Sequence, residues 1–429
     1  MIAVCALVIR VGYAASRHDV VALGDSKVYH NAANALADGE GFTKSAFMRD
    51  GLLVWDTDNP EASANPPGAI AFYSIGSFLG LRSFQQHMVW ASMLGTATVV
   101  IVGLLTRRLA GHAAGLSAAT AAAVYPSLWS WDGFVTSESV ACFLAVLLVW
   151  LITRFGDKPT LWRIIGIGSL GGIAVLTRSE LSLYLPLIYL PTVIRHRSWS
   201  WRQRSSAIAI AALTAITITV PWMAYNSGRF EHPVLLTTSF GQTLASGNCD
   251  ATYYGDFSGY WSFGCNMSVA ASADMPKEAD QTQADRAYAR FATRYAKDHI
   301  PRLAAVVPMR IGRTFYLYRP LQQLRFDRDA EGREPFVALS AFIGYWILAL
   351  ASVVGIRHLR RLGNPVLGLV MPFFVVAAGV ALTFGNVRSR STAEPFLCVL
   401  GGIGLVTVTG TLRSRVFAHK PDAVVEKAV

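Results

Sequence analysis

Long apolar segments with almost no charge recur along this chain. Several windows of about 17 or more residues carry hardly a charge, and that is the length an α-helix needs to cross the hydrocarbon layer of a bilayer. A composition that is 53% hydrophobic over 429 residues cannot be hidden in one soluble core. The sequence therefore predicts an all-α polytopic membrane protein.

The apolar windows predict about ten transmembrane helices. They lie near residues 1–16, 85–106, 110–127, 137–154, 161–177, 181–195, 205–224, 335–356, 363–384 and 393–411. Arg10 interrupts the first window. A cleaved signal peptide is therefore the alternative to a transmembrane helix at residues 1–16. The sequence has no basic amino-terminal region, and this favours an uncleaved helix.

Basic clusters set the expected orientation of these helices. With the amino terminus in the cytoplasm, each large cluster, such as Arg107 and Arg108, falls on the cytoplasmic side, as the positive-inside rule requires. The net charge of +11 then reflects topology and not nucleic-acid binding. We expect a multi-pass protein of the inner (plasma) membrane, with residues 17–84 and 225–334 on its outer face.

The two outer regions divide the chain into three expected parts. These are a transmembrane module at 1–224 that includes the first outer loop (17–84), an outer region with amphipathic and interfacial helices at 225–334, and transmembrane helices with a short cytoplasmic tail at 335–429.

Some segments fit neither a membrane span nor an ordinary loop. Residues 68–81 are apolar but too short to cross a bilayer, so we expect a re-entrant or interfacial helix. Four arginines make residues 301–319 a poor span and a good interfacial helix beside lipid phosphates. Cys249 and Cys265 share the second outer region, where the environment permits a disulfide between them.

Acidic residues concentrate in the first outer loop. The chain is only 15% charged, yet this loop holds Asp19, Asp25, Asp38, Glu40, Asp50, Asp56, Asp58 and Glu61. Carboxylates placed where hydrocarbon gives way to water are the first candidates for chemistry.

Several short motifs occur in an order that suggests a family. They are Asp25 with Tyr29 four residues on, the run Asp38-Gly39-Glu40-Gly41-Phe42, Pro66-Pro67-Gly68, Ser137-Glu138, Leu176-Thr177-Arg178, Pro221-Trp222 with Asn226, and Arg388-Ser389-Arg390 before Glu394-Pro395. In this order they resemble the C-type glycosyltransferases, in particular the protein O-mannosyltransferase and aminoarabinose transferase-like group.

The resemblance implies a helical-bundle enzyme that moves a sugar from a polyprenyl-phosphate carrier to an acceptor on the outer face, with inversion at the anomeric centre. The sugar would be mannose- or arabinose-like, and the acceptor a glycan, a glycolipid or a protein. Such a reaction needs a base for the acceptor hydroxyl, cations for the departing phosphate and an apolar groove for the prenyl chain.

Asp25 is the expected general base, because the resemblance places it at the start of the catalytic loop. The alternative is a helix N-cap, which Asp favours. Relatives often carry a second acid beside this one, whereas this chain has Ser26. Asp56 or Asp58 could fold back to supply that acid. We predict no cofactor and no metal, although a divalent metal is not excluded.

Arg178, Arg388 and Arg390 are the expected ligands of the donor phosphate. They stand at the outer ends of predicted helices, and guanidinium groups bind phosphate in a bidentate manner. The alternative is that they extend towards lipid headgroups.

Seven further residues are expected to line the substrate site. Three of them have an ordinary alternative, which is packing for Tyr29 and His30 and a charge that complements a helix N-terminus for Glu138. Trp129 and Trp131 could stack on sugar rings, but an aromatic belt at the membrane surface is the favoured explanation for them. The seven residues are Tyr29, His30, Asp56, Asp58, Asn65, Glu138 and Asn226.

Other functions remain open at this stage. A transporter or flippase of a lipid-linked sugar should carry charges within its spans and show related halves, whereas here charge gathers in two outer regions. An inactive relative that acts as a scaffold in envelope biogenesis is a further alternative, because the second acid is missing.

Overall fold

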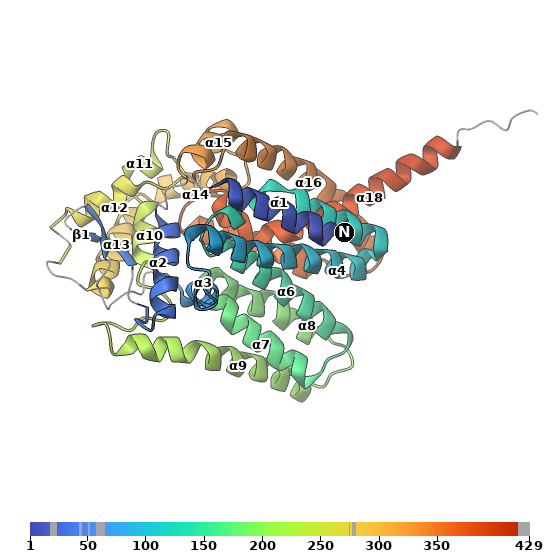
Figure 1. Ribbon diagram of the computed structural model, residues 1–429, viewed down its shortest axis with the longest axis horizontal. Coiled ribbons are helices and arrows are strands. Elements are labelled where there is room, and N and C mark those ends of the chain that lie inside the picture. Colours follow the sequence, from blue (N-terminus) through green and yellow to red (C-terminus); the bar gives the residue numbers. More distant parts are fainter. Residues whose placement is uncertain are drawn as a thin grey trace, which may run out of the picture.

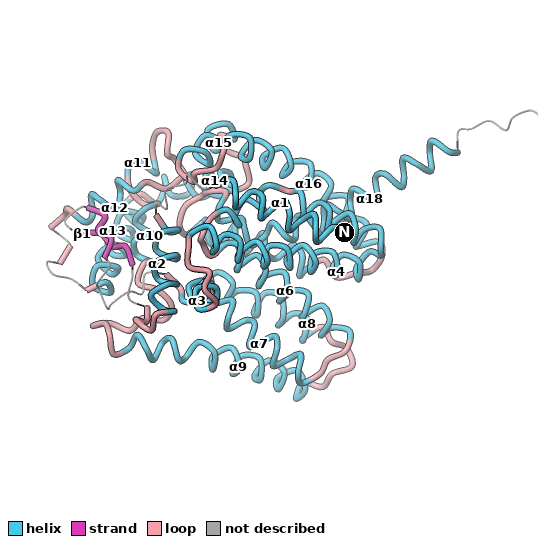
Figure 2. Tube along the Cα trace, in the orientation of Figure 1, coloured by secondary structure: helices cyan, strands magenta, loops and turns pink. Residues whose placement is uncertain are grey.

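The computed structural model describes residues 1–17, 24–42, 45–49, 52–56, 65–273, 275–276 and 280–418. Within this part of the chain the structure is helical apart from one antiparallel pair of strands, β1 (Ser45–Arg49) and β2 (Leu52–Asp56) (Figure 2). The predicted fold class is therefore confirmed. Asp58, like Asp19, Asp50 and Glu61, lies outside the described residues.

The long apolar helices form one bundle, in which α18 packs on both α16 and α4, and α7 packs on α9. Among the described residues, five helical segments are long and apolar enough to cross a membrane, and four apolar helical segments are shorter. In Figure 1 the bundle runs along the long axis, with the amino terminus at one end. Its main members are α1 (Ile2–Ser16), α4 (Phe84–Val124), α6 (Glu138–Asp157), α7 (Leu161–Val175), α8 (Leu190–Ile194), α9 (Trp201–Ser227), α16 (Pro335–Arg361), α17 (Leu367–Leu382) and α18 (Glu394–Ala418).

Helix α4 contains two of the predicted spans. Its backbone leaves helical geometry at Ala110 and Gly111, where Gly111 has φ 86°, a conformation that costs glycine little and other residues much. A Cβ on Gly103 would lie against Ala119, and one on Gly115 against Arg107. These contacts show that the two halves of α4 fold back on each other as an antiparallel hairpin.

Arg10 interrupts the first apolar helix and is fully buried. Its guanidinium forms an ion pair with Asp132 at 2.9 Å, and both side chains are 1% exposed. It also donates to the backbone carbonyls of Ala122 and Ala123. Burial of a charge is tolerated only with such partners. The pair thereby fixes α1 against the short segments α5 (Pro126–Trp129) and η1 (Ser130–Gly133) that follow α4.

Short helices gather at the end of the bundle away from the amino terminus (Figure 1). Helix α3 appears nearly end-on in that view, across the direction of the bundle. Cys249 and Cys265 form the predicted disulfide, with their Cα atoms 5.8 Å apart. The short helices are α2 (Asp25–Ala37), α3 (Pro67–Phe78), α10 (Phe240–Ser246), α11 (Asp250–Tyr253), α12 (Phe263–Ala270), α13 (Gln281–Asp298), α14 (Ile300–Thr314) and α15 (Pro320–Asp329).

Helix α14 does not present all its arginines to lipid, as the sequence suggested. Arg310 and Arg313 are 1% and 0% exposed. Arg310 donates to the carbonyl of Gly247, and Arg313 donates to the carbonyls of Ser258 and Asp256. The prediction of headgroup contacts is wrong for these two residues, because otherwise unpaired carbonyls of the neighbouring loop hold them inside the protein.

The contact between α16 and α18 yields a stability prediction. A Cβ on Gly404 would lie 1.9 Å from the carbonyl oxygen of Ala351 in α16, whereas a Cβ on Gly410 in the same helix would meet nothing within 4 Å. We expect Gly404→Ala to lower the free energy of unfolding by about 1–3 kcal/mol through overpacking. Thermal unfolding in detergent would measure this, and Gly410→Ala should change little. Equal effects in both variants would contradict the close approach of α16 and α18 at Gly404.

Candidate active site

Asp25 and Arg388 meet although they lie at opposite ends of the chain. A guanidinium nitrogen of Arg388 is 2.8 Å from a carboxylate oxygen of Asp25. Gly24 occupies the N-cap position of α2 with φ 55°, and Asp25 is the first helical residue. The N-cap alternative for Asp25 is therefore wrong, and its half-exposed carboxylate is turned towards Arg388.

The Asp25–Arg388 pair lines a polar cavity of about 1010 Å³. The cavity walls come from the end of α1, the start of α2, the segment before α3, the turn between η1 and α6, helices α10 and α12, the turn between α15 and α16, and the segment η4 (Arg388–Ala393). A volume of this size lies at the upper end of the range for ligand pockets. The cavity thus unites the two polar regions, 17–84 and 225–334, which lie about 140 residues apart in the sequence.

Glu138 holds two of the predicted arginines in place. Its side chain is 0% exposed, and it accepts from Arg388 at 2.5 Å and from Arg178 at 2.9 Å. Arg178 is further paired with Glu180. Neither Glu138 nor Arg178 is among the residues that line the cavity. Glu138 therefore lies behind Arg388 and not on the cavity wall, where the sequence analysis expected it.

Arg390 lies outside the cavity, and we leave it out of the phosphate site. It is 0% exposed, donates to Glu394 at 2.7 Å and to the carbonyl of Thr314, and stacks 3.8 Å from the ring centroid of Tyr345. These partners make it a structural cation that joins η4 to α14 and α16. The sequence could not separate it from Arg388, which is only two residues away.

The other predicted lining residues divide into three groups. Asn65 lines the cavity. Tyr29 and His30 do not: Tyr29 is buried behind Asp25, where loss of water raises the pKa of its hydroxyl, and His30 contacts His87. Asn226 is fully buried in α9. Asp56 ends β2, for which the structure defines the backbone only.

Six charged residues that the sequence analysis missed line the cavity with Asp25 and Arg388. They are Arg17, Arg328, Asp329, Glu331, Arg333 and Glu334. Arg17 forms an ion pair with Glu334, which also accepts from the hydroxyl of Tyr13 at 2.6 Å. Arg333 is 2% exposed and lies 4.3 Å from the ring centroid of Trp131, and its three guanidinium nitrogens have no hydrogen-bond partner among the described residues. The run Glu331-Gly332-Arg333-Glu334 was the available sequence signal, because it is unusually charged and directly precedes an apolar helix.

Glu331 is one of the carboxylates that line the cavity, and its charge acts on Arg388. It accepts a hydrogen bond from Asn386 at 3.2 Å. Removal from water raises the pKa of Glu331, and the nearby Arg388 charge opposes this shift. A carboxylate besides Asp25 thus lies near Arg388, and it comes from the turn between α15 and α16 and not from the first loop.

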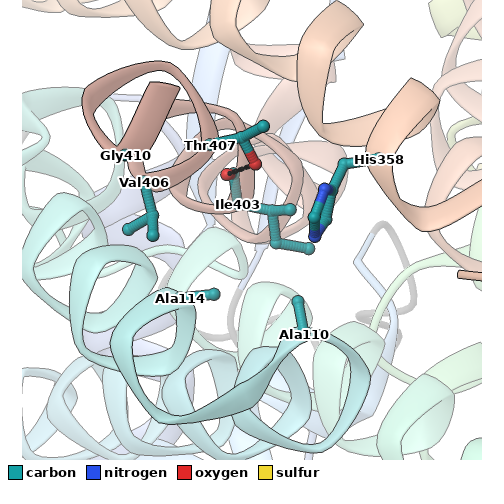
Figure 3. Close-up of a pocket in the computed structure, with 7 residues that line it drawn as sticks. All are labelled: Ala110, Ala114, His358, Ile403, Val406, Thr407 and Gly410. Carbon is teal, nitrogen blue, oxygen red and sulfur yellow. Dashed lines mark hydrogen bonds between the residues drawn. The ribbon is translucent and has the colours of Figure 1, made fainter. Parts of the chain in front are cut away.

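A second cavity, of about 370 Å³, lies beside the α4 kink at the other end of the bundle (Figure 3). His358 is the one titratable residue among its lining, which offers neither a carboxylate nor an arginine within the described part of the chain. The chemistry that the sequence suggests therefore fits the larger cavity. The lining residues are Ala110, Ala114, His358, Ile403, Val406, Thr407 and Gly410.

The helical fold of the chain is similar to that of solved C-type glycosyltransferases. Residues 64–225 match the family model of dolichyl-phosphate-mannose-protein mannosyltransferases. The chain is similar over 99% of its length to oligosaccharyltransferase AglB from Archaeoglobus fulgidus, at a TM-score of 0.53 and 14% sequence identity. It spans 52% of that chain, about half.

Two further solved structures are similar to the chain. A second structure of the Archaeoglobus fulgidus oligosaccharyltransferase, in complex with zinc and sulfate, gives a TM-score of 0.54 at 14% identity, over 97% of this chain and 50% of that one. ArnT from Cupriavidus metallidurans, bound to undecaprenyl phosphate, is similar at a TM-score of 0.43 and 14% identity, over 98% of this chain and 80% of that one. No curated protein sequence matches the chain.

Glu138 yields a prediction about the integrity of this site. Replacing it with Ala leaves the charges of Arg178 and Arg388 without their shared buried partner, and breaking one side of a buried ion pair costs about 3–5 kcal/mol. We expect a clear fall in the thermal unfolding midpoint of Glu138→Ala in detergent. Glu180→Ala removes only a partly exposed contact with Arg178 and should cost much less. A larger loss in Glu180→Ala would contradict the central position of Glu138.

Proposed function

We propose that this protein is a membrane glycosyltransferase that moves a sugar from a polyprenyl-phosphate carrier to an acceptor hydroxyl. The observation that carries the proposal is the Asp25–Arg388 pair at 2.8 Å on the wall of the large cavity. It joins the expected base and an expected phosphate ligand, which lie near opposite ends of the sequence.

Asp25 would act as the general base. Its carboxylate is half-exposed to the cavity, so an acceptor hydroxyl can approach it within hydrogen-bonding distance. The acceptor oxygen attacks the anomeric carbon as Asp25 takes the hydroxyl proton, and the bond between that carbon and the phosphate oxygen breaks. Attack from the face opposite the phosphate inverts the anomeric centre. The products are the glycosylated acceptor, the free lipid phosphate and protonated Asp25.

Arg388 would stabilise the departing phosphate. It is 24% exposed and is held from behind by Glu138, so its position is fixed before substrate binds, as electrostatic catalysis requires. Arg333 lines the same cavity with its guanidinium unpaired among the described residues and is the second candidate ligand. One oligosaccharyltransferase of this fold was solved with dolichol-phosphate, which supports a lipid phosphate as the donor headgroup.

The proposed location is the plasma membrane, with the cavity on the outer face. The basic clusters at the cytoplasmic ends of the predicted helices support this orientation. A flippase would not need a carboxylate paired with the phosphate-binding arginine beside an acceptor-sized cavity. The sugar transferred, mannose- or arabinose-like, rests on the resemblance to the transferase family.

Replacing Asp25 with Asn tests the proposed base. Asn can still accept a hydrogen bond from Arg388, so we expect normal folding, while loss of the base lowers transfer by roughly 10²- to 10⁴-fold. The measurement is transfer from radiolabelled polyprenyl-phosphate mannose or arabinose in membranes that contain the protein. Asp38→Asn is the matched control, because Asp38 lies at the far end of α2 and pairs with the surface residue Arg82.

Glu331→Gln belongs in the same experiment, because Glu331 is the other carboxylate beside Arg388. A smaller loss than in Asp25→Asn is expected. If Asp25→Asn transfers sugar at the wild-type rate, the proposed base is wrong, and a severe loss in Glu331→Gln alone would move that role to Glu331.

The reaction is predicted to need no divalent metal, because arginines can neutralise the phosphate charge. We expect transfer to be unchanged, within about twofold, after treatment with EDTA and removal of the chelator by gel filtration. Activity that is abolished by EDTA and restored by magnesium or manganese would overturn this prediction.

A further inference from the structure

One wall of the large cavity carries no charge. Residues between 239 and 266 contribute serine, threonine, glutamine, asparagine and aromatic side chains to the lining, and every charged residue of the lining comes from another segment of the described chain. We call this part the neutral wall and define it as Ser239, Gln242, Thr243, Ser246, Trp261 and Asn266.

Helix α10 arranges the polar groups of the neutral wall in a row. Gln242, Thr243 and Ser246 lie on one face of the helix, because Ser246 follows Gln242 by four residues and Thr243 by three. Ser239 is the N-cap residue of the same helix. The side-chain amide of Gln242 makes no hydrogen bond to another described residue, whereas the backbone N–H groups of Gly241 and Gln242 donate to Asp285. The helix is thus anchored by its backbone, and Gln242 remains available to a ligand.

The side-chain oxygen of Asn266 lacks a hydrogen-bond partner among the described residues. The residue is 3% exposed, and its amide nitrogen donates to the hydroxyl of Ser246 at 2.8 Å. Its carbonyl oxygen is buried and has no partner among the described residues. A buried amide oxygen without a donor is destabilising. A ligand hydroxyl on this wall would satisfy it.

The disulfide holds the wall rigid. Cys249 and Cys265 join the turn after α10 to the start of α12, directly next to Asn266. Trp261 and Phe263 line the same side of the cavity and offer flat apolar surfaces beside the amides and hydroxyls. Several fixed hydroxyl and amide groups beside an aromatic face match a sugar ring, which has polar edges and apolar faces.

We propose that the neutral wall binds the sugar rings of a neutral glycan acceptor. This inference rests on the proposed transferase function and names the acceptor class that the function leaves open. The charged residues belong to the donor phosphate and the base, so the donor occupies the charged side of the cavity, and the uncharged wall is left for the acceptor. An anionic acceptor would meet no cation on this wall.

Gln242→Ala and Thr243→Val test the proposal. We expect the KM for a methyl-capped mannotriose acceptor to rise about fivefold in Gln242→Ala, since losing one hydrogen bond to a neutral group, worth about 1 kcal/mol, corresponds to about a fivefold change. The kcat should change much less. Thr293→Val is the matched control for Thr243→Val, because both hydroxyls bond to the carbonyl four residues earlier, but Thr293 is exposed on α13.

Two further measurements separate the possible ligands. Release of sugar from the donor without acceptor reports on donor binding alone; if Gln242→Ala slows this hydrolysis as strongly as transfer, the wall holds the donor sugar and the acceptor assignment is overturned. A Ser/Thr-rich peptide that accepts sugar while the mannotriose does not would also overturn it, in favour of a protein acceptor.

Direct binding keeps the inference distinct from the proposed function. Saturation-transfer NMR of the mannotriose with purified protein requires no turnover. Weaker binding of the mannotriose in Gln242→Ala supports the neutral wall whether or not the protein turns over a donor. If the mannotriose binds but no donor is ever hydrolysed or used for transfer, the transferase proposal is rejected and the neutral wall is not. If the mannotriose does not bind to the wild-type protein, the proposal for the neutral wall is wrong.

Discussion

The chain of ion pairs from Arg178 through Glu138 and Arg388 to Asp25 is the interaction on which the cavity depends. Glu138 is fully buried and would be unstable as a lone charge. Its two arginines compensate that charge, and they also join α2, α6, the segment after α7 and η4 at one point. Because each group needs the others, Arg388 has a defined position at the cavity surface without any ligand.

The cavity separates two kinds of chemistry on two parts of its wall. Charged groups from both ends of the chain surround Asp25 and Arg388, whereas the wall formed by residues 239–266 offers hydroxyls, amides and aromatic rings. A glycosyl transfer between a lipid phosphate and a neutral glycan needs this division, since the phosphate requires cations and the glycan requires directional hydrogen bonds. In the proposed reaction, the helical bundle would hold the enzyme in the membrane, and the small helices at its end would bind the acceptor.

Much of the fold was predictable, but the candidate site was predictable only in part. All ten apolar windows coincide with helical segments, because the length and hydrophobicity of a span are local properties. Asp25 and Arg388 were identified, yet Arg390 and Arg178 were not separated from Arg388. The segment η4 is a 3-10 helix with about three residues per turn, so residues 388 and 390 point in different directions, and sequence alone did not reveal this local geometry. Arg17, Glu331 and Arg333 were missed because their role depends on contacts with distant segments.

The sequence by itself determined that the protein is a helical membrane bundle with its chemistry at one polar end, because apolar length and clustered charge are properties of neighbouring residues. Only the tertiary structure decided which charges meet. Arg310 and Arg390 become buried structural cations, whereas Arg388 and Glu331 face the cavity. The physical reason is that a charge in a low-dielectric interior is governed by the partners within a few ångströms of it, and here those partners lie in distant parts of the chain.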